Sequence, residues 1–334
     1  MSPLFPTAQD NVTVSVLIPN YNHAAFLPQR IDSVINQTFD DIEIILMDDC
    51  SADDSRSIIS DYATRDARIR VVMNDKNSGS TFSQWNKGIA LAKGKYVWIA
   101  ESDDYAEINF LQILVSVLDA NPEVGLAYAN SLAVDERGNV LNDVKDALND
   151  SVKTSLWNED FIMNGRIFLK EYMSFVNGIP NASAVLIRKS ILNSIGKADD
   201  TMRLAGDWVH WNKALYVSDI GYVREPLNYF RTHVNNVRSN TVKNGVFIVE
   251  ISRVMAMIKL LFPNEPYNYK SIKLFVDYWI LSYRDGYVTM EQNLKILKNI
   301  SGIVDNRSVL AYRVTKFVFK SFLTKVRTML KAIG

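Results

Sequence analysis

The sequence lacks the features that mark several classes of protein. It has one cysteine, Cys50, in 334 residues, which excludes an intramolecular disulfide and argues against a cysteine-based zinc site. Its 37 basic and 37 acidic residues balance, so no overall basic field points to a nucleic acid as partner. No run of about 18 apolar residues predicts a membrane span, and residues 1–11 show no signal peptide. A reducing, cytoplasmic compartment fits this composition.

A glycine-rich phosphate loop is also missing. The β-branched run of residues 12–19 predicts a first buried strand, and the turn that follows it is Pro-Asn-Tyr-Asn (residues 19–22). This turn matches neither the dinucleotide fingerprint nor a Walker loop. A bound nucleotide would therefore be held by side-chain carboxylates and a metal.

What the sequence does contain is a regular alternation of expected strands and helices. Apolar runs predict strands at 12–19, 42–47, 69–73 and 96–100, with helices between them. This order is typical of an α/β fold with a doubly wound, mostly parallel sheet. Because the carboxyl ends of parallel strands share one edge, the polar loops after these strands should converge there: Asn20–Tyr21, Asp48–Asp49, Lys76–Asn77 and Asp103–Asp104.

The last of these strands ends in three acidic residues, Glu101, Asp103 and Asp104. Carboxylates at the end of a buried strand are costly unless a positive group neutralises them. A divalent cation that carries a phosphate-bearing substrate would do so. A solvated acidic turn is the alternative, and this stretch alone does not decide between the two.

Several segments, taken together, resemble the family 2 glycosyltransferases, which have the GT-A fold. Their order and spacing match that family over roughly residues 12–125. The resemblance implies an inverting, non-processive transferase that uses a nucleotide-activated sugar and Mn²⁺ or Mg²⁺. The matching segments are 14–22, 33–38, 48–53, 77–79, 86–88, 94–96 and 101–104.

The resemblance implies roles for residues of the nucleotide site. Pro19 and Tyr21 would lie against the base and ribose, and Asp49 would accept a hydrogen bond from the imide of uracil or thymine. A carboxylate suits that task because charge-assisted hydrogen bonds are about twice as strong as neutral ones. Lys76 is assigned to the donor as well.

The same resemblance implies a metal site. Asp103 and Asp104 form the DxD-like element, in which one aspartate coordinates the metal and the other touches the ribose; which does which stays open. Glu101 replaces the usual first aspartate, so its direct role is also open. His233 is a further candidate for the metal or the diphosphate, with an exposed loop histidine as the alternative.

The second half of the chain resembles the family less closely. Asn181 is a candidate for sugar contact, and Arg231 for neutralising the leaving group. Asp207, in Gly-Asp-Trp, corresponds to the family's catalytic base, and the alternative is an aspartate that only caps a helix. Trp208 and Trp211 could flank the acceptor sugar.

We expect a catalytic domain over residues 10–238, a helical appendage over 239–300 and a basic amphipathic helix over 301–334. Seven lysines and arginines but no acidic residue occur from Arg307 to the end. A basic amphipathic helix favours contact with an anionic membrane surface. A terminal helix packed on the domain is the alternative.

The predicted function is metal-assisted, inverting transfer of one sugar (a hexosyl-type reaction) from a UDP- or dTDP-sugar. The acceptor would be a glycan or lipid-linked glycan in surface-polysaccharide biosynthesis, on the inner face of the cytoplasmic membrane. Two alternatives remain, a nucleotidyltransferase that makes nucleotide sugars and a non-catalytic nucleotide-sugar binding protein. The first would be expected to carry a glycine-rich phosphate loop after the first strand.

Overall fold

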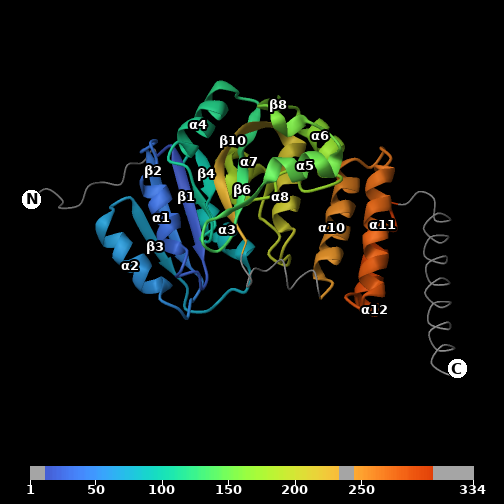
Figure 1. Cartoon of the computed structure of the whole chain (residues 1–334), viewed down its shortest axis with the longest axis horizontal. Coiled ribbons are helices and arrows are strands. Elements are labelled where there is room, and N and C mark those ends of the chain that lie inside the picture. The colour runs from blue at the N-terminus through green and yellow to red at the C-terminus, as the bar shows by residue number, and fades with distance from the viewer. Residues whose placement is uncertain (1–11, 233–243, 304–334) are drawn as a thin grey trace, which may run out of the picture. The chain divides into compact units, whose positions relative to one another are not determined.

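A computed structural model describes residues 12–232 and 244–303 (Figure 1). These residues divide into two compact units, the first containing residues 12–202 and 206–232 and the second containing 203–205 and 244–303. The expected boundary at 238/239 and the expected helix at 301–334 lie wholly or mostly outside the described residues.

The first unit is built on a ten-stranded sheet with the order β3-β2-β1-β4-β9-β6-β10-β5, in which β7 also pairs with β6 and β8 with β10. The strands are β1 (Val14–Asn20), β2 (Ile42–Asp48), β3 (Ile69–Met73), β4 (Tyr96–Ile99), β5 (Tyr105–Ala106), β6 (Val124–Val134), β7 (Val140–Asp143), β8 (Phe161–Met163), β9 (Val185–Arg188) and β10 (Asp219–Arg231).

The helices of this unit connect or flank those strands. In Figure 1, α2 lies beside β3 at one edge of the sheet. The α-helices of the first unit are α1 (Leu27–Ile35), α2 (Ser55–Arg65), α3 (Thr81–Leu91), α4 (Phe110–Ala120), α5 (Val144–Val152), α6 (Gly165–Phe168), α7 (Lys189–Ile195) and α8 (Gly206–Val217). Short 3-10 turns lie at Leu156–Asn158 and Ala182–Ala184, and a π turn lies at Leu169–Met173.

The first half of the sheet confirms the predicted parallel α/β arrangement. β3, β2, β1 and β4 are all parallel, and β1 and β2 end together with Asn20 opposite Asp48. The second half is mixed, because β9 runs antiparallel between β4 and β6 while β6 and β10 are parallel. The alternation of strand and helix, on which the prediction rested, ends after β4.

The main core lies where α1 and α4 cover one face of the sheet. Alternate residues of β1, namely Val14, Val16 and Ile18, pack there with Leu27 of α1 and Leu114 of α4. All five side chains are fully buried. This face supports the strand ends that carry the polar loops.

The second unit contains α10 (Val246–Leu261), α11 (Tyr269–Arg284) and α12 (Met290–Ile300), drawn in orange in Figure 1. Its core includes Phe275, Trp279 and Ile296, and Trp279 Nε1 donates to Asn293 Oδ1 over 2.7 Å. None of the helices in residues 12–232 and 244–303 is long and apolar enough to cross a membrane.

Glu250, on α10, is a buried charged residue with three backbone partners in this unit. Its carboxylate accepts hydrogen bonds from the N–H groups of Arg203, Leu204 and Ala205 over 2.5, 2.9 and 2.8 Å. A buried carboxylate is tolerated when donors surround it in this way. Glu250 therefore fixes the segment 203–205 to α10.

We expect Glu250→Ala to lower the free energy of unfolding by about 2–4 kcal/mol, because it leaves three backbone N–H groups, of which that of Ala205 is buried, without an acceptor. Urea unfolding followed by far-UV circular dichroism measures this loss. Glu265→Ala, at an exposed position, is the control and should change stability little. Equal losses in the two variants would contradict this account of Glu250.

Candidate active site

Side-chain hydrogen bonds join the carboxyl ends of β1 and β2. Asn20 Nδ2 donates to Asp48 Oδ1 over 3.1 Å. The fully buried Asp48 carboxylate also accepts from the Ser51 N–H over 2.9 Å and pairs with Arg56 Nε at 3.2 Å. Its buried charge is tolerated because it is paired. Asp48 thus joins the first two loops of the sheet edge.

Asp49, the predicted base-binding residue, is only 4% exposed and is held by donors from the next loop and α3. Its Oδ1 accepts from Asn74 Nδ2, the Ser78 N–H and Gln84 Nε2 over 2.7, 2.9 and 2.9 Å. Its Oδ2 accepts from Ser78 Oγ over 2.7 Å. Among the described residues, three donors reach Oδ1, whereas Ser78 Oγ alone donates to Oδ2.

The other predicted nucleotide contacts differ in exposure. Pro19 is buried within β1, whereas Tyr21 is 46% exposed in the following turn and Lys76 is exposed. Burial of Pro19 in the strand favours Tyr21 over Pro19 as the side chain that meets a base. The Lys76 side chain lies at the surface, and its contact with the donor stays a prediction.

The acidic loop after β4 is held from several sides. Asp104 is 2% exposed, and its Oδ2 accepts from Asn181 Nδ2 over 3.0 Å and from Ser183 Oγ over 2.6 Å. Its Oδ1 accepts from the Arg231 N–H over 2.9 Å. Burial, and after it the charge of Asp103, raise the pKa of Asp104. Asp104 is therefore a well-anchored residue.

Asn181 and Arg231 serve this loop rather than an open cleft. The Asn181 amide bonds Asp104 on one side and the Ser183 N–H on the other. Arg231 is 3% exposed, and it donates to the backbone oxygens of Asp103, Asp135 and Glu136 and to the Gln29 side chain. Their positions therefore do not support the expected contacts with the sugar and the leaving diphosphate.

Glu101 links the acidic loop to α3. Its Oε1 accepts from Trp85 Nε1 over 2.7 Å. Burial raises the pKa of Glu101 to about 8, with Asp103 adding to the effect and the Trp85 hydrogen bond opposing it. Trp85 in turn packs against His210 and Trp211 of α8, with ring centroids 6.3 and 5.9 Å apart. The acidic loop and the helix that carries Asp207 therefore share Trp85.

Asp207 lies in the first turn of α8 and is half-buried. Its Oδ1 accepts from the Trp208 N–H over 2.7 Å and its Oδ2 from Asn177 Nδ2 over 3.0 Å. Gly206 precedes it because a Cβ there would lie 2.5 Å from the Phe82 ring. Asp207 lies inside the helix, and its bond to the N–H of the next residue differs from a helix cap, which accepts from an N–H two or three residues further on.

The two tryptophans after Asp207 do not form a sugar platform. Trp208 is 8% exposed and donates from Nε1 to the Met173 carbonyl over 3.0 Å, and Trp211 is 1% exposed. The expectation that they flank an acceptor is wrong, because both rings belong to the packing around α8.

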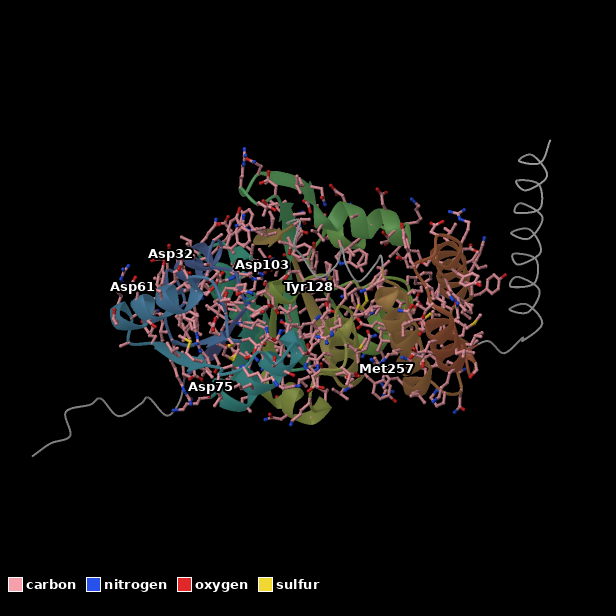
Figure 2. The ribbon with its side chains drawn as sticks, turned by 90° about the horizontal axis from the view of Figure 1, so that it is seen from below. Asp32, Asp61, Asp75, Asp103, Tyr128 and Met257 are labelled. Carbon is pink, nitrogen blue, oxygen red and sulfur yellow. The ribbon has the colours of Figure 1, made fainter. Side chains whose placement is uncertain are left out.

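A divalent cation fits one of the two aspartates better than the other. Mn²⁺ and Mg²⁺ take oxygen ligands, and three protein donors already occupy the Asp104 carboxylate. Asp103, half-buried on the same loop (Figure 2), is the better candidate. Within residues 12–232 and 244–303 no group of three His, Cys, Asp or Glu could hold a metal, so a bound cation would need diphosphate and water oxygens. His233 lies outside the described residues.

The sequence-based reasoning missed Arg30, which lies on α1 among apolar residues and is fully buried. Its Nε donates to the Glu101 carbonyl over 2.8 Å, and its guanidinium lies 5.5 Å from the centre of the Trp98 ring. An arginine on the apolar face of a predicted helix was the available signal. Gln84 and Ser183, which hold Asp49 and Asp104, had no comparable signal.

His210 on α8 is a buried histidine whose two ring nitrogens have no hydrogen-bond partner among the described residues. Burial, with a smaller effect of Lys213, lowers its pKa to about 4. The folded state therefore keeps the ring neutral while the unfolded chain takes up a proton below about pH 6.5. Stability should fall as the pH drops from 6.5 towards 4.

We expect the wild-type free energy of unfolding to be about 2 kcal/mol lower at pH 5 than at pH 7 through His210 alone. His210→Phe, which keeps a ring of similar size, should lose this part of the pH dependence. Urea unfolding of both proteins at the two pH values measures it, with His23→Phe as the matched control. An unchanged pH dependence in His210→Phe would contradict the assignment.

Comparison with known proteins agrees with this geometry. Residues 15–172 match the model of the Glycosyl transferase family 2 domain. The chain is 42% identical over 108 residues to the uncharacterized glycosyltransferase EpsJ of Bacillus subtilis, which covers 32% of this chain and 31% of EpsJ. It is 25% identical over 228 residues to an uncharacterized glycosyltransferase of Haemophilus influenzae, covering 68% and 67% of the two chains.

Among solved structures, S. aureus TarS 1–349 in complex with UDP-GlcNAc has a TM-score of 0.63 at 18% identity, covering 87% of this chain and 81% of that one. The likeness shows a shared GT-A fold. Together these findings support glycosyltransferase family 2 for the part of the chain over residues 15–172. The chain spans only 15–47% of the length of the first five curated relatives that it matches.

Proposed function

We propose that the protein transfers one sugar, with inversion, from a UDP- or dTDP-sugar to a hydroxyl of a glycan or lipid-linked glycan acceptor. The observation that supports this best is the group of polar loops, two of them acidic, at the carboxyl ends of β1, β2, β3 and β4. They are joined by Asn20–Asp48, Asp49–Ser78 and His23–Ser102 hydrogen bonds. In open α/β sheets this edge is where ligands bind.

The donor would lie along this edge. Asp49 Oδ2 would accept a hydrogen bond from the imide N–H of the base, and the exposed Tyr21 ring would cover the face of the base. Lys76 would meet the donor's negative charge. A divalent cation on Asp103, when bound, would offset the charge of the diphosphate as the glycosidic bond breaks.

The transfer step is carried by Asp207. The acceptor oxygen forms a bond to C1 of the sugar while the bond from C1 to the diphosphate oxygen breaks, and the acceptor proton passes to the Asp207 carboxylate. Asn177 Nδ2, which donates to Asp207 Oδ2, would orient that carboxylate. Inversion follows because the attack comes from the face opposite the leaving group.

A role in surface polysaccharide synthesis is supported by relatives such as the putative teichuronic acid biosynthesis glycosyltransferase TuaG of Bacillus subtilis, 40% identical over 91 residues. If the acceptor is linked to a lipid of the inner leaflet, the basic segment 307–334 would bind the anionic surface of that membrane. That segment lies outside the described residues, so binding of the full chain to anionic vesicles is the appropriate test.

Release of UDP or dTDP from a panel of UDP- and dTDP-sugars with Mn²⁺ and acceptor separates the candidate functions. Steady release of nucleoside diphosphate is expected for a transferase. Pyrophosphate exchange would indicate a nucleotidyltransferase, and donor binding without release would indicate a non-catalytic binding protein.

Asp207→Asn should lower kcat by at least about a hundredfold, because a general base contributes about 10²–10⁴ in rate. Donor affinity should change less than about threefold, since the amide keeps the side chain's shape. Steady-state kinetics and donor titration measure the two effects. Turnover at the wild-type rate would remove Asp207 from the role of base.

Asp103→Asn should weaken Mn²⁺-dependent UDP binding by about tenfold or more, because it replaces a charged metal ligand with a neutral one. Calorimetric titration of UDP with and without Mn²⁺ measures it. Asp75→Asn, at an exposed position in the loop after β3 and apart from Asp103 (Figure 2), is the control. Equal UDP affinity in wild type and Asp103→Asn would contradict the assignment.

A further inference from the structure

Arg30 is the one fully buried arginine side chain of the described residues that leaves donors unused. It is 0% exposed, and only its Nε has a partner, the Glu101 carbonyl at 2.8 Å. Its two terminal nitrogens have no hydrogen-bond partner among the described residues. A buried guanidinium with unused donors is costly, so its presence calls for a compensating interaction.

The compensation comes from the acidic loop. The carboxyl groups of Asp104, Asp103 and Glu101 all favour the charged form of Arg30 and oppose the effect of burial. The pKa of Arg30 is lowered by burial only to about 10, so the group stays positive at neutral pH. The Trp98 ring beneath the guanidinium adds a favourable contact with the cation.

The loop consequently lies between two fixed cations. Arg30 bonds the carbonyl of Glu101 at its start, and Arg231 bonds the carbonyl of Asp103 further along. The Arg231 guanidinium also donates to three other oxygens, whereas the two terminal nitrogens of Arg30 have no hydrogen-bond partner among the described residues. The positive charges of Arg30 and Arg231, which come from α1 and β10, thus offset part of the negative charge of the three carboxyl groups of the loop.

We propose that Arg30 is a resident counter-cation of the acidic loop, which sets how strongly the loop attracts a divalent cation. This rests on the proposed metal-assisted function and concerns a residue that touches neither donor nor acceptor, so Arg30 is a positioning residue. With Arg30 in place, the loop attracts Mn²⁺ weakly by itself. The cation is held well only together with a diphosphate, whose oxygens supply both ligands and negative charge.

The test measures Mn²⁺ binding without any sugar transfer. Free Mn²⁺ is followed by electron paramagnetic resonance at pH 8, with and without UDP, in wild type, Arg30→Gln and Arg30→Lys. Removing a buried positive charge near the site should tighten binding of Mn²⁺ alone by at least about tenfold in Arg30→Gln. Arg30→Lys keeps the charge and should stay within about threefold of wild type.

The outcomes separate this inference from the proposed function. If wild type binds no Mn²⁺ even with UDP, the metal-assisted function fails. If wild type binds Mn²⁺ with UDP but Arg30→Gln binds Mn²⁺ alone no more tightly than wild type, the counter-cation role fails. An Mn²⁺ affinity of Arg30→Lys equal to that of Arg30→Gln would also overturn the counter-cation role, because binding would then not depend on the positive charge at position 30.

A second variant decides the matter if Arg30→Gln does not fold. Arg30→Gln combined with Asp104→Asn removes one charge of each sign, and its net loop charge equals that of wild type. We expect this double variant to recover the fold and to bind Mn²⁺ within about threefold of wild type. A double variant as unfolded as the single one would show that Arg30 acts through packing alone and would overturn the proposal.

Discussion

The candidate site depends on the way this chain keeps several carboxylates close together beneath its surface. Each is stable only because specific donors reach it: Asn20 and Arg56 reach Asp48, the Ser78 loop reaches Asp49, and Ser183 reaches Asp104. A carboxylate that lost such a partner would carry the full cost of desolvation. The polar loops are therefore part of the folded framework as much as they are candidate ligand contacts.

The donors come from both halves of the first unit. β1 to β4 present the acidic residues, whereas the region around β9 and the end of β10 supply Asn181, Ser183 and Arg231. Trp85 adds a separate connection, because its indole nitrogen meets Glu101 and its ring meets α8. This arrangement explains how a conventional parallel sheet and a mixed extension can act as one site.

Much of the first half of the fold could be predicted from the sequence, because each buried parallel strand is a short apolar run followed by a polar turn. The convergence of the loops followed from that pattern alone. The mixed second half could not be predicted, since the direction of β9 depends on pairing between segments far apart in the chain. Which aspartate fits a cation also needed the structure, because it depends on the donors around Asp104. Arg231 looked like a ligand contact in the sequence, yet only its hydrogen bonds reveal that it holds the loop.

The hydrogen bond from the Arg231 N–H to Asp104 joins residues that are 127 positions apart in the sequence. The hydrogen bond from Asn181 to Asp104 joins residues that are 77 positions apart. The segment that matches the family model ends at residue 172 and so contains Asp104 but neither Asn181 nor Arg231. A fragment that stopped there would expose a carboxylate built for burial and would lack the residues that shape its loop. Contacts of such long range close only when most of the first unit has assembled. The ability to bind the donor would therefore form late in folding. In a refolding experiment, the recovery of donor binding would show when β10, which carries Arg231, has joined the sheet.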